Sequence, residues 1–253
     1  MTYASYLKVP ELLSLQVERS VGPEGAEHDE LLFIVVHQVY ELWFKSLGHE
    51  LRGVQLALEE GDTDRALHLL NRVLKILKTL VAQVDVLETM TPLQFLSFRD
   101  RLESASGFQS AGFRAIEALL GVREASAVEA QPEGSDARRT IEEAQSATSV
   151  WESFLGYLAE RGHPVPDDAG ATDTRVQEVL IAAYRDDADA GLVAERLVDL
   201  DEGIQEWRYR HVKMVERTIG TKRGTGGSSG VEYLRGTLFR PAFPDLWEIR
   251  SRL

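Results

Sequence analysis

Two histidines stand within apolar helical patterns, where an imidazole can bind a ligand or a metal. His37 follows six consecutive apolar residues, 31–36, in the stretch EHDELLFIVVHQVYELWFKSLGHEL. At helical spacing it shares a face with Phe33, Glu41 and Phe44. A buried imidazole needs a polar partner. The stretch alone leaves two interpretations open: a core histidine hydrogen-bonded to a neighbouring element, or a histidine that faces a ligand.

The second histidine, His211, falls on the inward face of a long helix that we expect from about residue 188 to 219. That face carries Leu200, Ile204, Trp207, His211, Met214 and Thr218. Residues spaced by threes and fours lie on one side of a helix. His211, like His37, is therefore surrounded by apolar neighbours.

Two further features carry positive charge. Arg99 comes one turn after Phe95 on a short apolar helix, where an arginine is usually a solvated surface charge. The segment 222–230, KRGTGGSSG, matches neither a P-loop nor a dinucleotide-binding fingerprint. It is either a flexible surface loop or a nest of backbone N–H groups that binds an anion beside two cations.

The composition excludes several classes of protein. With no cysteine, the chain can form neither disulfides nor thiolate-ligated metal or haem sites, so any metal must be held by His, Asp or Glu. A formal charge of −13 argues against a nucleic-acid partner. The N-terminus lacks a basic, apolar leader, and no window approaches 18 uninterrupted apolar residues. We therefore expect a cytoplasmic protein without a membrane partner.

The elements that must position these residues are helices. Apolar periodicity predicts an all-α fold in a single domain, residues 1–253, without strands. The expected helices span about 27–51, 64–88, 91–103, 108–120, 151–160, 173–184 and 188–219. The first is expected to be buried on nearly every side of its first half, and Thr91-Pro92 with Gln94 has the form of a capped helix start. The Ala-, Glu- and Ser-rich composition of residues 122–149 predicts only a weak, partly mobile connection with one polar helix.

An aromatic arm, residues 1–16, precedes the first long helix. It carries Tyr3, Tyr6 and Leu7 ahead of a short helix expected around 10–16. So short an arm has little of its own to pack against. It either lies on its own domain or reaches a neighbouring subunit, and the sequence does not choose between the two.

Five stretches taken together resemble the tryptophan 2,3-dioxygenase family. They are HDELLFIVVHQVYELWFK, LETMTP, FRDRLESASGFQS, WRYRHVKMVERTIG and KRGTGGSSG, in family order and at family-like separations. The resemblance runs from the YASYL arm to the closing PDLWEIR and weakens across 122–149 and 163–195. It implies an all-helical homotetramer that binds haem b non-covalently through one histidine.

The resemblance also implies roles around the haem. His211, in WRYRH, matches the proximal iron ligand, and Ser106 and Gly107, in ASGFQS, match the turn that lines the haem-side pocket. His37 matches the distal histidine, which hydrogen-bonds the indole N–H of the substrate. Phe33 would pack on that indole.

The remaining implied roles concern the amino-acid part of the substrate. Arg99 matches the residue that forks onto the carboxylate, and Thr225 matches the one that meets the ammonium and carboxylate. Tyr6 and Leu7 match arm residues that close a neighbouring subunit's site. Phe95 matches a substrate-binding position where some bacterial members have a tyrosine and other members a phenylalanine, so the difference concerns one hydroxyl contact and not the activity.

The implied reaction inserts both atoms of O2 across the indole C2–C3 bond of L-tryptophan and gives N-formylkynurenine. The nearest alternative is a related haem oxygenase of secondary metabolism acting on a modified indole. A non-haem iron site using His28 and Glu30 is disfavoured because residues two apart on a helix do not face one point. A haem-binding sensor or interaction protein without turnover would not need Arg99 and Thr225.

Overall fold

The computed structural model describes residues 1–22, 25–103, 105–170, 172–225 and 230–253. In this part of the chain the regular elements are helices, with one isolated β-bridge between Gly22 and Gly25. The expectation of an all-α fold is therefore confirmed. Positions 226–229 of the glycine-rich segment, for which a surface loop and an anion nest were the two interpretations, lie outside the described residues.

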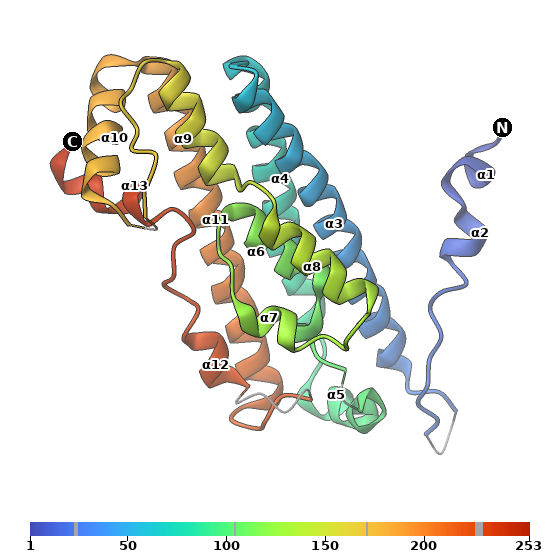
Figure 1. Cartoon of the computed structure of the whole chain (residues 1–253). Helices are drawn as coiled ribbons and strands as arrows, with labels where there is room; N and C mark the ends of the chain where they lie inside the picture. The colour runs from blue at the N-terminus through green and yellow to red at the C-terminus, as the bar shows by residue number, and fades with distance from the viewer. Residues whose placement is uncertain (23–24, 104, 171, 226–229) are drawn as a thin grey trace.

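Three long helices form the scaffold. They are α3 (His28–Glu59), α4 (Thr63–Leu87) and α11 (Ala188–Ile219), and α4 packs between the other two (Figure 1). Asp62 caps α4 by accepting the Arg65 amide at 3.0 Å, and Asp187 caps α11 by accepting the Ala190 amide at 3.1 Å. Their facing apolar stripes make the core.

Shorter helices cover this scaffold. They are α5 (Pro92–Phe98), α6 (Ala111–Leu120), α7 (Ala125–Glu129), α8 (Asp136–Ser146), α9 (Val150–Glu160), α10 (Thr174–Asp186), α12 (Val231–Arg235) and α13 (Pro244–Glu248), with 3-10 helices η1 (Arg99–Leu102), η2 (Gly107–Gln109) and η3 (Ile249–Arg252). Helix α6 approaches α3 closely at Gly112, where a Cβ atom would lie 2.6 Å from the Glu41 carboxylate. A larger residue at this position would have to displace the Glu41 carboxylate and would press against Cβ of Phe44, 3.2 Å away.

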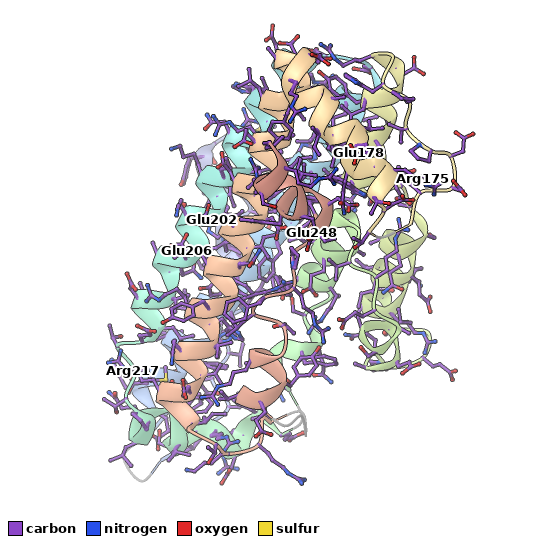
Figure 2. All side chains as sticks on the ribbon, turned by 90° about the vertical axis from the view of Figure 1, so that its left-hand side faces the viewer. Arg175, Glu178, Glu202, Glu206, Arg217 and Glu248 are labelled. Atoms are coloured by element: carbon purple, nitrogen blue, oxygen red, sulfur yellow. The ribbon has the colours of Figure 1, made fainter. Side chains whose placement is uncertain are left out.

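The outer side of α11 carries charge, opposite to its apolar stripe. Figure 2 shows Glu202, Glu206 and Arg217 on this helix, and the Lys78 ammonium of α4 lies 2.6 Å from the Glu206 carboxylate. This division between a charged and an apolar face explains why the His211 stripe faces inward.

Helix α3 corrects two expectations. It continues to Glu59, beyond the expected end near residue 51. It is also less enclosed than its apolar run predicted, because Leu31, Val35 and Leu42 are exposed. Within the described residues these side chains lie on the side of α3 that no other long helix covers. Apolar composition alone does not distinguish a buried face from an uncovered one.

The expected helix over 91–103 and the expected helix over 108–120 are each divided. The Thr91–Gln94 capping box is confirmed, but α5 ends at Phe98 and the chain continues as the 3-10 helix η1. The second begins as the 3-10 helix η2, after which the Ser110 hydroxyl accepts the Phe113 amide at 3.1 Å and starts α6. A side-chain cap inside an apolar run thus starts a new helix.

Residues 122–149 contain one more helix than expected. They form the two helices α7 and α8, of which α8 packs against α6. Ile141 and Ala144 are buried in that contact. The expectation of one helix was wrong, and the polar helix α8 docks on α6 through a few apolar side chains.

The N-terminal arm differs from the expected single short helix at 10–16. It forms α1 (Tyr3–Leu7) and α2 (Val9–Leu12), which stand apart from the helical body in Figure 1. The arm joins the body at Glu30, whose carboxylate accepts the backbone amides of Arg19 at 3.0 Å and Ser20 at 2.8 Å. The arm therefore has a fixed root and an exposed tip.

Candidate active site

A cavity of about 880 Å³ lies between α3, α5, α6, α11 and α12. This volume is near the upper end of the range of roughly 300–1,000 Å³ that ligand pockets occupy. Most of the residues singled out from the sequence line it, although they come from distant parts of the chain. These are Phe33, His37, Phe95, Arg99, Ser106, Gly107, His211 and Thr225.

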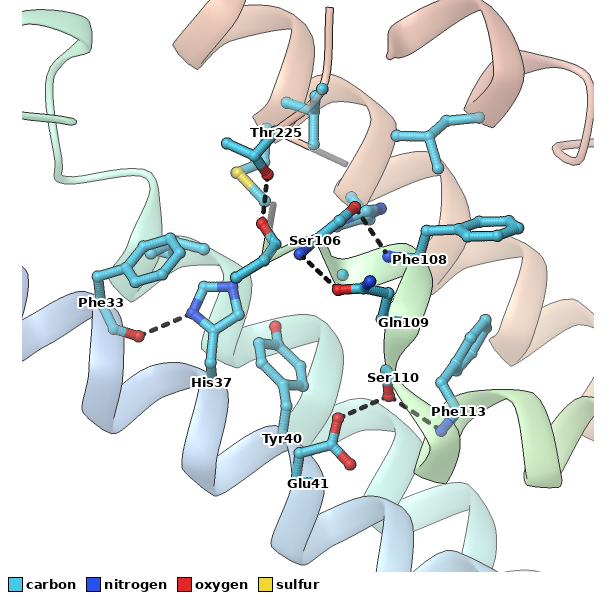
Figure 3. A pocket seen from close by; sticks show the side chains of 18 of the residues that line it. Phe33, His37, Tyr40, Glu41, Ser106, Phe108, Gln109, Ser110, Phe113 and Thr225 are labelled. Atoms are coloured by element: carbon cyan, nitrogen blue, oxygen red, sulfur yellow. Dashed lines mark hydrogen bonds between the residues drawn. The ribbon is translucent and has the colours of Figure 1, made fainter. Parts of the chain in front are cut away.

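The His37 imidazole is held in one orientation by its own helix. Its Nδ1 atom lies 2.7 Å from the backbone carbonyl oxygen of Phe33, one turn earlier on α3 (Figure 3). A carbonyl only accepts, so Nδ1 carries the hydrogen and Nε2 keeps its lone pair. Burial lowers the pKa of His37, and the bond to Phe33 offsets this only in part. The ring is therefore neutral, with Nε2 free to accept a hydrogen bond.

An aromatic wall adjoins His37. The Phe33 ring lies 4.0 Å from the His37 ring centroid, 5.8 Å from that of Phe95 and 5.5 Å from that of Phe98. Phe98 is fully buried behind this wall. Rings at these separations pack favourably and present an apolar face to a flat ligand.

His211 lines the cavity from α11. Burial lowers the pKa of His211 to about 4, and the proximity of the His37 imidazole and the charge of Arg114 act in the same direction. The two imidazoles thus share one enclosure. A neutral imidazole with a free lone pair is the form that binds a metal ion.

The wall that carries Arg99 is tied to the segment that carries Thr225. The Arg99 guanidinium donates from Nη2 to the Arg223 carbonyl oxygen at 2.5 Å, and the Thr225 hydroxyl donates to the Ala105 carbonyl oxygen. This bond uses one N–H of the Arg99 guanidinium. The others remain for a carboxylate, since a guanidinium carries five donors.

The turn after Arg99 is shaped by Ser106. The Ser106 hydroxyl accepts the Phe108 amide at 3.3 Å, and the Ser106 amide donates to the Gln109 side chain, also at 3.3 Å (Figure 3). A Cβ atom at Gly107 would meet no protein atom within 4 Å. The turn thus presents open space to the cavity.

Sequence reasoning missed a buried charged group in the cavity wall. Arg114 donates to one oxygen of the Glu117 carboxylate at 2.6 Å, and Arg208 donates to the other at 2.8 Å. All three side chains are buried. Two cations against one anion leave one positive charge uncompensated within the group, which favours an anionic ligand.

A tyrosine adds a donor to this group. The Tyr233 hydroxyl is buried and has no hydrogen-bond partner among the described residues. Burial raises the pKa of the Tyr233 phenol, and the nearby Arg114 opposes that effect. A sequence signal existed for part of the group, since Arg114 and Glu117 interrupt the apolar run AGFRAIEALL of α6.

The arm residues are the exception among the expected site residues. Tyr6 is 70% exposed and Leu7 is 45% exposed, and neither lines the cavity of its own chain. Farther along the arm, Leu12 and Leu15 do line it. The Gln38 side chain donates to the Leu15 carbonyl oxygen at 3.0 Å and holds this part of the arm on α3.

The described residues contain neither a membrane-spanning helix nor a cluster of metal ligands. No described helix is long and apolar enough to cross a membrane. Nor do three or more His, Cys, Asp or Glu side chains gather into a metal-binding group among the described residues. Glu30, of the alternative His28–Glu30 iron site, is instead occupied with the root of the arm.

Comparison with known proteins is consistent across the whole chain. A family model described as Tryptophan 2,3-dioxygenase matches residues 1–149 and 170–253. Tryptophan 2,3-dioxygenase of Anaeromyxobacter sp. (strain K) is 58% identical over 260 residues, covering 100% of this chain and 96% of the relative. That of Herpetosiphon aurantiacus is 53% identical over 264 residues, covering 100% of this chain and 98% of the relative.

The match includes residues 122–149, where the resemblance was expected to weaken, and leaves out 150–169. The alignments with these relatives cover the full chain and so include both walls of the cavity. The chain belongs to the tryptophan 2,3-dioxygenase family.

Proposed function

We propose that this chain is a haem-dependent dioxygenase that inserts both atoms of O2 across the indole C2–C3 bond of L-tryptophan, giving N-formylkynurenine. Family membership supports the reaction class. The observation that carries the proposal is the arrangement of two neutral imidazoles, His37 and His211, in one apolar cavity whose wall holds Arg99. The apolar walls suit a flat ligand, and Arg99 suits the carboxylate of an amino acid.

The residues present fit haem b. His211 would bind the iron, because its imidazole is neutral and no described residue hydrogen-bonds it. Arg114 and Tyr233 would hold the carboxylates of the porphyrin, because they supply an uncompensated positive charge and an unpaired hydroxyl. When bound, ferrous haem supplies the centre at which O2 is activated.

The chain's own residues would orient the substrate. Arg99 would bind the α-carboxylate with its remaining N–H groups, and Thr225 would contact the ammonium or the carboxylate. Nε2 of His37 would accept the indole N–H, while Phe33 packs on the indole face. Since His37 is neutral and a weak base, its contribution is to orient the indole and to accept its proton late in the reaction.

The exposed arm supports a homotetramer. Tyr6 and Leu7 stand on an arm whose tip does not pack against its own chain. We propose that they close the cavity of a neighbouring subunit, while Leu12 and Leu15 of the same arm line their own. Each site would then contain residues of two chains.

The experiment that tests the proposal is an absorption spectrum with a tryptophan turnover assay on the parent protein and on Arg99→Ala. Arg99 is half-buried, so we expect the substitution to weaken tryptophan binding by about 2 kcal/mol, or ~30-fold, with haem content unchanged. Arg101→Ala is the matched control, since Arg101 is exposed in the same 3-10 helix and does not line the cavity.

Three results would contradict the proposal or one of its parts. If the parent protein shows no haem spectrum, the assignment of haem as its cofactor is wrong. A parent protein that binds haem but cleaves the indole ring of tryptophan no faster than that of a modified indole lacking the carboxylate would indicate the alternative substrate class. If Arg99→Ala weakens tryptophan binding no more than Arg101→Ala does, Arg99 is a surface charge that does not bind the substrate.

A further inference from the structure

The imidazole of His211 lies parallel to an indole ring of the same helix. The ring centroids of Trp207 and His211 are 5.3 Å apart and their planes are inclined by only 2°. Residues four apart on a helix are neighbours, but their rings need not be parallel. An offset parallel arrangement at this distance is a favourable geometry for two aromatic rings.

The indole itself is held from other helices. Phe113 of α6 lies 4.7 Å from the Trp207 ring, and Phe44 of α3 meets it edge-on at 6.1 Å. Tyr40 of α3 meets it at 6.2 Å and donates its hydroxyl hydrogen to the Leu80 carbonyl oxygen of α4 at 3.0 Å. Trp207 is therefore a fixed surface, set by contacts from α3 and α6.

Hydrogen bonding does not set the His211 ring in the same way. A histidine that binds a metal almost always donates its second ring N–H to a carboxylate, a carbonyl or water. Among the described residues no backbone or side-chain group makes such a bond with His211, whereas His37 is held by the Phe33 carbonyl oxygen. Within the described protein, the contact that can fix the His211 ring plane is the Trp207 face.

We infer that Trp207 is the positioning residue for the iron ligand: its indole face sets the plane of the His211 imidazole and so favours one orientation of the ligand on the haem. The inference rests on the proposed haem site. It assigns to Trp207 a role that its place in the apolar stripe of α11 does not by itself suggest.

The test replaces the His211 side chain by free imidazole, which is not attached to the chain. In His211→Gly, imidazole added with haem can take the place of the missing side chain, and the concentration that restores half of the haem spectrum measures its binding. If the indole face holds the ring, His211→Gly/Trp207→Leu should need roughly 2- to 13-fold more imidazole, the range that corresponds to one aromatic pair. Trp207→Phe in the same background keeps part of the aromatic face and should fall between.

The control is His211→Gly/Trp151→Leu. Trp151 packs against Phe154 and Phe243, each at 5.7 Å, and does not line the cavity. The Trp151→Leu substitution also replaces a tryptophan by leucine, but away from His211. The imidazole concentration that restores half of the haem spectrum should therefore equal that of His211→Gly. Far-ultraviolet circular dichroism identifies the variants that fold. If Trp207→Leu unfolds the protein, the comparison is made with Trp207→Phe.

Equal imidazole requirements in His211→Gly and in every folded Trp207 variant would overturn the inference. An equal increase in the Trp151 control would also overturn it, because the effect would then be a general loss of packing. These results are distinct from failure of the proposed function, in which the parent protein with His211 intact would bind no haem.

Discussion

Replacing the indole N–H of the substrate by N-methyl tests the orientation of His37 directly. The Phe33 carbonyl oxygen occupies Nδ1 of His37 at 2.7 Å, so only Nε2 can accept the indole hydrogen. Burial lowers the pKa of this imidazole, so the lost bond is one between neutral groups and contributes roughly 0.5–1.5 kcal/mol. Crowding by the methyl group brings the expected total to about 1–3 kcal/mol, or roughly 5- to 160-fold in kcat/KM.

The assay compares kcat/KM for L-tryptophan and N1-methyltryptophan in three proteins. In the parent, kcat/KM should be roughly 5- to 160-fold higher for L-tryptophan than for N1-methyltryptophan. His37→Ala removes both the acceptor and the crowding, so the two substrates should converge. His49→Ala is the control, because His49 is an exposed histidine of the same helix outside the cavity, and it should discriminate as the parent does. If His37→Ala still discriminates as strongly as the parent, Nε2 does not face the indole and the reasoning is refuted.

Other consequences can be measured separately. His211→Ala should lose haem while His37→Ala keeps it; equal haem-to-protein ratios would disprove the ligand assignment. Since burial lowers the pKa of His37 below 6.5, kcat/KM for tryptophan should stay constant as the pH falls to that value and decline only below it, and a decline centred above 6.5 would contradict a neutral, buried ring. Removal of residues 1–7 should raise KM for tryptophan at unchanged haem content; an unaltered KM would exclude the arm from the site. The Arg161 guanidinium holds the pKa of Asp187 below its usual range, so this pair stabilises the fold above about pH 4 and the contribution is lost as the pH falls. Asparagine caps a helix as well as aspartate, so Asp187→Asn should cost about 1 kcal/mol in urea unfolding at pH 7, and this cost should shrink progressively as the pH falls below about 4; a cost independent of pH would exclude the charge as its cause.

Much of this protein could be predicted from local patterns. Helix type and position follow from apolar periodicity and caps, which act within a few residues, and so α4 and α11 lie almost where they were expected. The resemblance to the family rested on short stretches around His37, Arg99 and His211, and these residues do line one cavity. Family membership was confirmed by the comparisons.

The helix ends and the exposed faces could not be predicted in this way. Division of the 108–120 helix at Ser110 depends on competition between a side-chain cap and the helical hydrogen-bond ladder, and the change from α-helix to 3-10 helix after Phe98 occurs without a side-chain cap. Exposure of Leu31 and Leu42 depends on which neighbours reach α3. Periodicity records that a face is apolar, and it does not record what covers that face.

The sequence by itself determined which residue types were available for chemistry: histidines in place of cysteines, and an arginine beside aromatic rings. Only the tertiary structure decided their states. The tautomer of His37 depends on the Phe33 carbonyl oxygen, and the charge excess of Arg114 and Arg208 depends on their meeting one Glu117 across two helices. Hydrogen bonds and burial are properties of atoms brought together in space, so a linear pattern can nominate such groups without fixing their protonation or their partners.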